Sequence, residues 1–218
     1  MKEIAIIGAG GFGREVKMLI DQINEKENKF HFIGYFDDGI EKGKEINGHK
    51  ILGNTKDLNE YSGEIDLVFS LADPKLKKKI LSNISKKDIN FPILIHPSCF
   101  IGGDNVNIGE GSIICAGTII TVDINIGEHV ILNLSCTVGH DTSIGSYSSF
   151  MPSVNISGEI EIGKGVYCGT GVKIINQVNI GEGTIIGAGA VVSKSLPANC
   201  TAVGVPAKPI KFNEKDNK

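Results

Sequence analysis

The chain has 218 residues, a net charge of −3, 41% hydrophobic residues and 6% aromatic residues. This length suits two modest domains, and the dispersed basic residues leave no electrostatic footprint for nucleic-acid binding. No apolar run reaches membrane-spanning length, and the first residues predict a strand rather than a signal peptide, so we expect no membrane insertion.

Residues 1–96 read as alternating strands and helices. Apolar runs at 3–7, 30–36, 65–71 and 91–95 predict strands, and helical spacing after the first strand predicts a helix. A second helix is expected from Pro74, with the lysine run 77–79 on a solvated face. This order predicts a small Rossmann-like parallel sheet, with its ligand site beyond the carboxyl ends of the strands.

A glycine-rich loop separates the first predicted strand from the first helix. Its GxGxxG pattern suits a diphosphate held by backbone N–H groups at a helix N-terminus. An acidic pair ends the next strand, where a carboxylate can hydrogen-bond a nucleoside. Two alternatives stay open: a tight turn without a ligand, and an NAD site, although the full dinucleotide fold has six strands. The predicted substrate-binding residues are Gly8, Gly10, Gly11, Phe12, Gly13, Asp37 and Asp38.

An apolar side chain recurs at every sixth position from residue 108 to residue 192. A fixed six-residue period is the signature of a parallel β-helix. Glycine often follows the core residue, which we attribute to positive φ at a sharp turn, and a small or β-branched residue stands four places after it. We predict a β-helix domain over 97–212 and a tail over 213–218. The core series is Ile108, Ile114, Ile120, Ile126, Leu132, Val138, Ile144, Phe150, Ile156, Ile162, Cys168, Ile174, Ile180, Ile186 and Val192.

The cysteines and histidines suggest neither disulfides nor metal binding. Five scattered cysteines lack CxxC spacing, and the five histidines form no HxH or HxxxH pair. We therefore expect reduced thiols in a cytoplasmic protein, and no metal site.

Three stretches together resemble the PglD/NeuD-like sugar acetyltransferases. They are 7–16 with Asp37 and Asp38, 133–141, and 203–208, and the likeness runs from Ile4 to about Ile210. The resemblance implies a Rossmann-like domain that binds a nucleotide sugar. It also implies a left-handed β-helix with three hexapeptides per coil, and a homotrimer with active sites between subunits.

The resemblance also assigns roles in catalysis. His140 matches the general base, Asp141 its acidic partner and Asn133 a supporting polar residue. Gly158, three hexapeptides beyond His140, matches the amide that binds the acetyl oxygen. Side chains adjacent on a strand point apart, so pairing His140 with Asp141 requires the geometry of a corner. The residues expected to bind acetyl-CoA are Gly158, Gly169, Gly187, Ala188, Val205, Pro206 and Lys208.

The sequence departs from the family at two places. Phe12 stands where many members have a histidine in the glycine loop, and Ser149 where some have a second active-site histidine. The implied reaction is acetyl transfer from acetyl-CoA to the amine of a UDP-linked 4-amino-4,6-dideoxy sugar, for a surface glycan. The alternatives are O-acetylation of a sialic-acid type sugar, a non-catalytic sugar-nucleotide-binding protein, and an NAD-dependent oxidoreductase.

Overall fold

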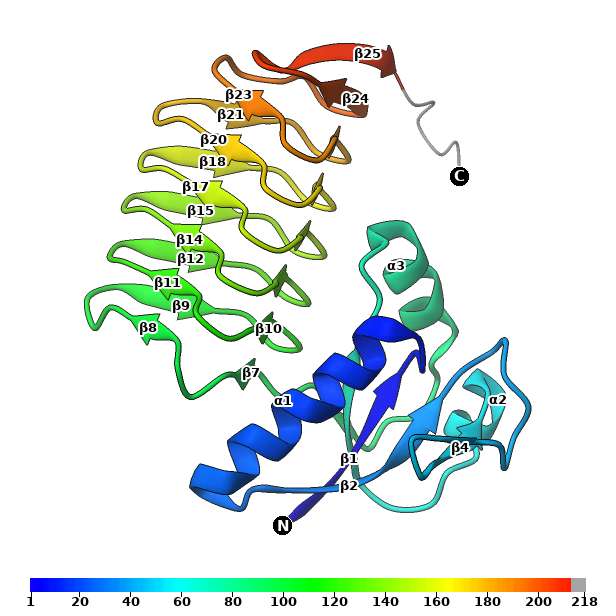
Figure 1. The fold of residues 1–218 in the computed structure, drawn as a ribbon. Helices are drawn as coiled ribbons and strands as arrows, with labels where there is room; N and C mark the ends of the chain where they lie inside the picture. Colours follow the sequence, from blue (N-terminus) through cyan, green and yellow to red (C-terminus); the bar gives the residue numbers. More distant parts are fainter. Residues whose placement is uncertain (213–218) are drawn as a thin grey trace. The chain divides into compact units, whose positions relative to one another are not determined.

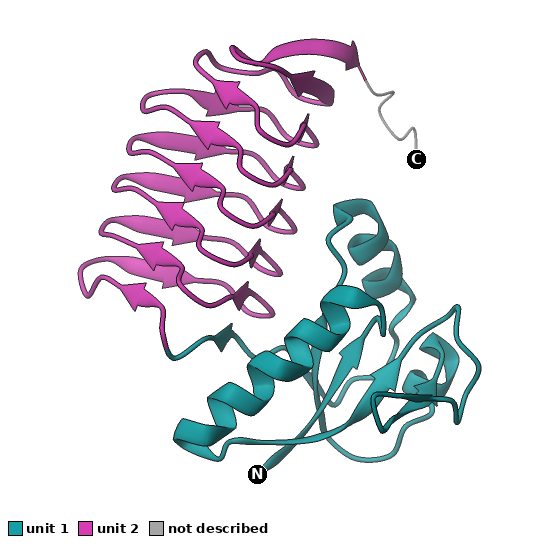
Figure 2. Ribbon diagram, viewed as in Figure 1, with its two compact units in different colours: residues 1–97 teal, residues 98–218 magenta. Residues whose placement is uncertain are grey.

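The computed structural model describes residues 1–212, and the expected tail at 213–218 lies outside the described residues. The chain divides into two compact units, residues 1–97 and residues from 98 onward (Figure 2). No helix between residues 1 and 212 is long and apolar enough to cross a membrane. All five cysteines are free thiols, four of them buried.

The first unit is a sheet of mostly parallel strands with three helices (Figure 1). Its elements are β1 (Lys2–Ile7), α1 (Gly11–Glu27), β2 (Phe30–Phe36), β3 (Glu45–Ile46), β4 (His49–Gly53), α2 (Thr55–Asn59), β5 (Ile65–Phe69), α3 (Pro74–Asn83), β6 (Ile89–Asn90) and β7 (Leu94–Ile95). The sheet order is β3-β4-β2-β1-β5-β6, with only the β3–β4 pair antiparallel. The predicted parallel sheet is therefore confirmed.

Several short elements of this unit differ from the prediction. The expected strand at 91–95 is replaced by β6, which pairs with β5, and by β7, which is not part of this sheet. The elements β3, β4 and α2 were not predicted. Helix α2 begins at a capping box, because the Asn54 side chain accepts from the Lys56 and Asp57 N–H groups while the Asp57 side chain accepts from the Asn54 N–H. One turn of helix is too short for an apolar period to reveal.

Helix α3 buries one lysine that the sequence placed in solvent. Lys77 is 1% exposed, whereas Leu76 is 41% exposed. The expectation of a solvated face for all three lysines is wrong for Lys77, because this residue shares a helix face with Ile80 and Leu81. Burial of its ammonium lowers the pKa of Lys77 from 10.5 to about 7.

The second unit is a parallel β-helix of short strands (Figure 1). Its strands are β8 (Phe100–Ile101), β9 (Val106–Ile108), β10 (Ile113–Ile114), β11 (Ile119–Ile120), β12 (Ile124–Ile126), β13 (Ile131–Leu132), β14 (Thr137–Val138), β15 (Thr142–Ile144), β16 (Ser149–Phe150), β17 (Asn155–Ile156), β18 (Ile160–Ile162), β19 (Tyr167–Cys168), β20 (Lys173–Ile174), β21 (Asn179–Ile180), β22 (Ile185–Ile186), β23 (Val191–Val192), β24 (Cys200–Val203) and β25 (Lys208–Phe212).

Three stacked sheets form the faces of this prism. One contains β10, β13, β16, β19, β22, β24 and β25; the second runs from β8 through β11, β14, β17 and β20 to β23; the third runs from β9 through β12, β15 and β18 to β21. Partner residues stand three hexapeptides apart, as in Ile114 with Leu132. The six-residue series fills the interior: Ile108 is half-buried and every later member is buried. The small or β-branched residues four places after each core residue are buried as well.

The glycines that follow the core residues serve close approach rather than a left-handed turn. Gly145 has no positive φ, but a β-carbon on it would lie 2.5 Å from backbone atoms of Gly163 and Lys164 in the next coil. The residue with positive φ comes two places later, as in Tyr147 at 68°. The expected role of these glycines is therefore wrong, since the spacing between stacked coils selects them.

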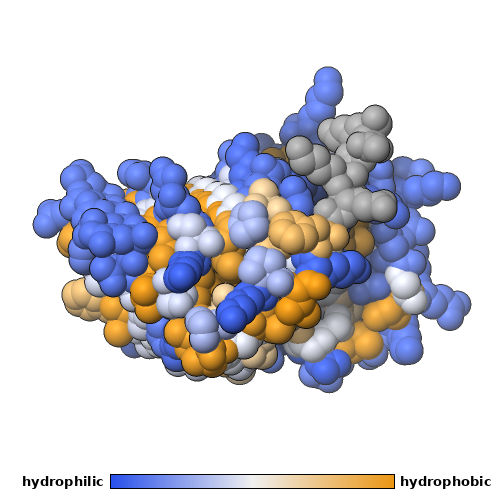
Figure 3. Space-filling view, turned by 90° about the horizontal axis from the view of Figure 1, so that it is seen from above, coloured by the Kyte–Doolittle hydropathy of each residue, from blue (hydrophilic) through white to orange (hydrophobic). Residues whose placement is uncertain are grey.

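The last coil ends in an antiparallel pair, β24 with β25. Val205, Ile210 and Phe212 are exposed in and before β25. Figure 3 shows hydrophobic residues lying between hydrophilic ones over one face of the molecule.

Candidate active site

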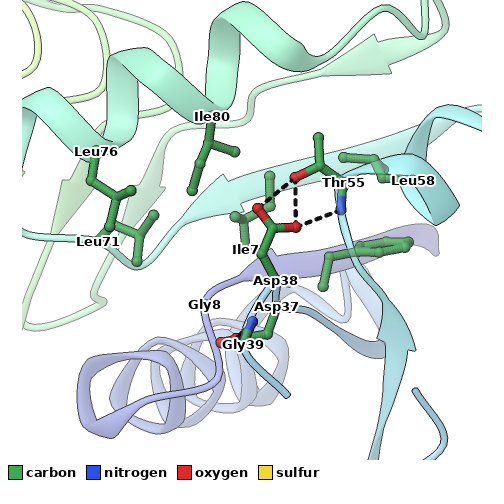
Figure 4. A pocket seen from close by; sticks show the side chains of 11 residues that line it. Ile7, Gly8, Asp37, Asp38, Gly39, Thr55, Leu58, Leu71, Leu76 and Ile80 are labelled. Carbon is green, nitrogen blue, oxygen red and sulfur yellow. Dashed lines mark hydrogen bonds between the residues drawn. The ribbon is translucent and has the colours of Figure 1, made fainter. Parts of the chain in front are cut away.

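The first unit contains a pocket at the carboxyl ends of its strands. The pocket has a volume of about 290 Å³ and is lined by Gly8 after β1, by Asp37, Asp38 and Gly39 after β2, and by Thr55 at the start of α2. On the opposite side lie apolar residues of α3 and the loop before it (Figure 4). These apolar residues are Leu71, Leu76 and Ile80.

Both acidic residues of the pocket are fixed by backbone and hydroxyl donors. The Asp37 carboxylate accepts from the Ala9 N–H at 2.8 Å and from the Gly39 N–H at 2.9 Å. The Asp38 carboxylate accepts from the Thr55 N–H at 2.7 Å and from the Thr55 hydroxyl at 2.9 Å (Figure 4). The side-chain polar groups that line the pocket are therefore two carboxylates and a hydroxyl, so the pocket suits a ligand that donates hydrogen bonds.

The four loop glycines divide into two structural roles. Gly8 is buried and has a φ of 99°. A β-carbon on Gly13 would collide with the Gly8 carbonyl oxygen, so the absence of a side chain at Gly13 allows the close contact of α1 with the end of β1. Gly10 and Gly11 are exposed, with open space where a β-carbon would be. Phe12 is half-buried and does not line the pocket. No side chain caps α1, and its first turn holds no acidic residue.

His140 and Asp141 form a hydrogen-bonded pair at a corner of the β-helix. The His140 Nδ1 lies 2.7 Å from the Asp141 Oδ2, and the two side chains are 56% and 59% exposed. Asp141 has φ 55°, so the chain turns between them and brings two adjacent side chains together. With Nδ1 donating to the carboxylate, Nε2 carries the lone pair that can accept a proton.

Gly158 lies one coil beyond His140 and touches its ring. The Glu159 N–H donates to the His140 carbonyl at 2.8 Å, which joins the two corners. A β-carbon on Gly158 would lie 2.6 Å from both Cε1 and Nε2 of the imidazole. Among the described residues, the Gly158 N–H donates to no other group.

Four other expected residues lie on a different edge of the prism. His140 and Gly158 follow β14 and β17 and form one edge, here called the His140 edge. A second edge, here called the Asn133 edge, follows β13, β19 and β22 and contains Asn133, Gly169, Gly187 and Ala188. Asn133 is buried, and its side-chain oxygen accepts from the Leu134 N–H at 2.7 Å. Val205 and Pro206 lie between β24 and β25, and Lys208 is exposed at the start of β25.

Sequence reasoning missed Thr55 and the apolar residues that line the pocket. Thr55 holds Asp38 from seventeen positions further along the chain. Leu76 and Ile80 of α3, and Leu71 of the loop before it, line the opposite side of the pocket. The Asn54–Asp57 capping pattern is the one signal that predicts a helix start beside the pocket.

Comparisons with known proteins agree with this architecture. Residues 3–84 match the family described as the PglD N-terminal domain. WeeI from Acinetobacter baumannii AYE shares 33% identity, with a TM-score of 0.86 over 96% of this chain and 100% of that one. The acetyltransferase domain of PglB from Neisseria gonorrhoeae FA1090, in complex with acetyl coenzyme A, shares 28% identity, with a TM-score of 0.85 over 96% and 99% of the two chains.

A third solved structure carries both a coenzyme and a sugar nucleotide. PerB from Caulobacter crescentus, in complex with CoA and GDP-perosamine, shares 28% identity, with a TM-score of 0.84 over 97% of this chain and 98% of that one. No protein in a search of curated sequences matches. The likeness to WeeI spans both units, including the left-handed β-helix. This chain is therefore a member of the PglD/NeuD-like family of sugar acetyltransferases.

Proposed function

We propose that this chain transfers the acetyl group of acetyl-CoA to the amine of a UDP-linked 4-amino-4,6-dideoxy sugar, with His140 as general base. The observation that carries the proposal is the contact of the His140 ring with both Asp141 and Gly158. The PglB domain bound to acetyl coenzyme A supports the donor, and PerB bound to GDP-perosamine supports a nucleotide-linked amino sugar as the acceptor.

The chemistry follows from the two atoms that Gly158 and His140 present. The acceptor nitrogen attacks the thioester carbonyl carbon, and His140 Nε2 takes the proton of that nitrogen as the new N–C bond forms. The Gly158 N–H donates to the carbonyl oxygen as negative charge develops there. When the C–S bond breaks, the protonated imidazole returns the proton to the sulfur. The Asp141 carboxylate stabilises the imidazolium between these steps.

The first unit offers complementary chemistry for a nucleotide. Asp37 and Asp38 accept hydrogen bonds and carry negative charge, so the pocket suits ribose hydroxyls or base N–H groups and disfavours a phosphate. The uncapped N-terminus of α1, with Gly10 and Gly11 open, suits the diphosphate.

The separation of the two edges supports assembly of the site from more than one chain. His140 and Gly158 lie on one edge of the prism, whereas Asn133, Gly169 and Gly187 lie on the other. We propose a homotrimer in which the Asn133 edge of one chain faces the His140 edge of its neighbour. Light scattering tests this: a monomer with full activity would contradict it.

Thiol release on mixing the protein with acetyl-CoA and sugar nucleotides tests the reaction. UDP-linked and GDP-linked 4-amino sugars are compared with a 4-hydroxy analogue, and mass spectrometry identifies the acetylated atom. His140→Ala should lower kcat by about 10²–10⁴-fold. Undiminished turnover in this variant would rule out His140 as the base, and transfer only to the hydroxyl analogue would change the acceptor class.

A further inference from the structure

We infer that the missing side chain of Gly158 is itself a positioning device, because it lets the His140 imidazole lie on the backbone of the next coil. This inference rests on the proposed function, but it assigns Gly158 a second role besides its N–H group. The role belongs to the space above its α-carbon, and any larger residue would fill that space.

The geometry gives the base nitrogen a defined position. We call this position of the His140 ring, against the α-carbon of Gly158, its seat. A β-carbon on Gly158 would lie 2.6 Å from Nε2 and from Cε1, and 3.0 Å from Cδ2. Contacting carbon atoms normally lie about 3.5–4.0 Å apart, so no β-carbon fits beneath this ring. One carbon–carbon bond adds about 1.5 Å, so Nε2 lies within about 4 Å of the Gly158 α-carbon. The end of the ring that accepts the proton is therefore the end that contacts Gly158.

Two further contacts hold the ring in this seat. The Asp141 carboxylate binds the other ring nitrogen, Nδ1, at 2.7 Å. The Glu159 N–H binds the His140 carbonyl at 2.8 Å, which fixes the spacing of the two coils at this edge. The ring is thus held at Nδ1 by a carboxylate and at Nε2 by contact with a bare α-carbon.

The seat also brings the base close to the Gly158 N–H. In the proposed reaction, the nitrogen that loses a proton and the oxygen that gains charge are bonded to the same carbon atom. Both must therefore meet their protein partners at one place. A misplacement of about 1 Å can cost on the order of 10²-fold in rate, so displacing the ring should reduce kcat even though the N–H remains.

Gly158→Ala isolates this role. The φ of Gly158 lies outside the left-handed region, so alanine fits the backbone and retains the N–H group. Gly103→Ala is the matched control, because Gly103 also follows a strand of the β8–β23 sheet by two residues, has no positive φ and has open space for a β-carbon. We expect Gly158→Ala to lower kcat by roughly 10²-fold with little change in the KM for acetyl-CoA, and Gly103→Ala to match wild type.

A double-mutant cycle separates positioning from a general defect. If Gly158→Ala acts through the imidazole, it should cost no more than about twofold in a His140→Ala background. Independent, multiplying losses would overturn the inference, and so would wild-type kcat in Gly158→Ala. Thermal unfolding of each variant shows whether the fold persists.

Nuclear magnetic resonance tests the seat without any activity. With labelled histidine and glycine, wild type should give cross-relaxation between the His140 ring protons and the Gly158 α-protons. Absence of this signal would overturn the inference even if Gly158→Ala does not fold. Its presence in a protein that acetylates no sugar nucleotide would reject the proposed function and leave the seat intact.

Discussion

Replacing Gly145 by alanine tests why glycine follows so many core residues of the β-helix. A β-carbon at this position would lie 2.5 Å from the Gly163 carbonyl carbon and the Lys164 nitrogen, about 1 Å inside normal contact. Nearby, the Gly145 N–H donates to the Ile162 carbonyl at 2.8 Å. Parting the coils by about 1 Å would stretch this hydrogen bond beyond its useful range.

The cost can be estimated from three opposing effects. Overpacking of a close-packed site costs about 1–3 kcal/mol, and one lost hydrogen bond adds about 1 kcal/mol. Alanine restricts the unfolded chain, which offsets about 0.4–1 kcal/mol. The free energy of unfolding should therefore fall by about 2 kcal/mol. Gly103→Ala has only the third effect and should gain about 0.4–1 kcal/mol.

Thermal denaturation followed by circular dichroism measures the difference. Gly145→Ala should melt roughly 5–10 °C below Gly103→Ala. Gly189→Ala separates the two possible causes, because Gly189 has φ 69° but open space for a β-carbon. The strain of the left-handed region costs about 1–2 kcal/mol and the restricted unfolded chain offsets about 0.4–1 kcal/mol, so this variant should lose at most about 1.6 kcal/mol. If Gly145→Ala is as stable as Gly103→Ala, close approach is not the reason for glycine here.

Three further predictions concern single side chains. Burial lowers the pKa of Lys77 to about 7, so above that pH the unfolded chain binds more protons than the folded protein does. The free energy of unfolding of wild type should therefore rise by about 1 kcal/mol per pH unit from pH 7 to 9. The Lys77→Met variant should lack this rise, and parallel pH profiles from denaturant titrations would contradict it. Asp141→Asn keeps the shape of the pair but removes its charge, so kcat should fall at least about tenfold with a smaller change in KM; an unchanged kcat would show that the carboxylate is idle. Burial raises the pKa of the Cys136 thiol to about 12 and raises that of Cys168 as well, and Cys115 and Cys200 are also buried. Only the half-buried Cys99 should therefore react with Ellman's reagent before denaturation, and a second fast thiol would disprove this.

The six-residue period predicts the β-helix well because each hexapeptide repeats one local environment. The same period predicts that Gly158 stacks one coil beyond His140, which the Glu159 to His140 hydrogen bond confirms. The period does not predict the backbone spacing between coils. The positive φ expected for Gly145 was therefore wrong. That spacing is a property of stacked coils, and no single hexapeptide contains it.

The first unit was harder to predict because its pocket joins residues far apart in sequence. Asp37 and Asp38 were expected at the end of a strand, and both line the pocket. Thr55 and Leu76 come from helices that pack beyond that strand, and no local pattern connects them to it. Lys77 was expected in solvent because of its charge. Its position on the buried face of α3 nevertheless places its side chain in the interior.

The choice of residues along the His140 edge follows from backbone cost. Left-handed residues at this edge are Asn105, Asp123, Asp141, Glu159 and Gln177, with no glycine among them, whereas the other two edges use glycine at six such positions and other residues at five. A side chain in this conformation costs about 1 kcal/mol relative to glycine, so each must gain something in return. The Asn105 amide donates to Asp123 at 2.8 Å, the Gln177 amide donates to Glu159 at 2.9 Å, and Asp141 holds His140. The column of side chains thus offsets its own backbone strain through hydrogen bonds between neighbouring coils, and only Asp141 directs its carboxylate to the imidazole. Glycine at position 141 would relieve the backbone strain but would lose the hydrogen bond to His140. An unstrained backbone and a fixed base therefore exclude each other at this corner.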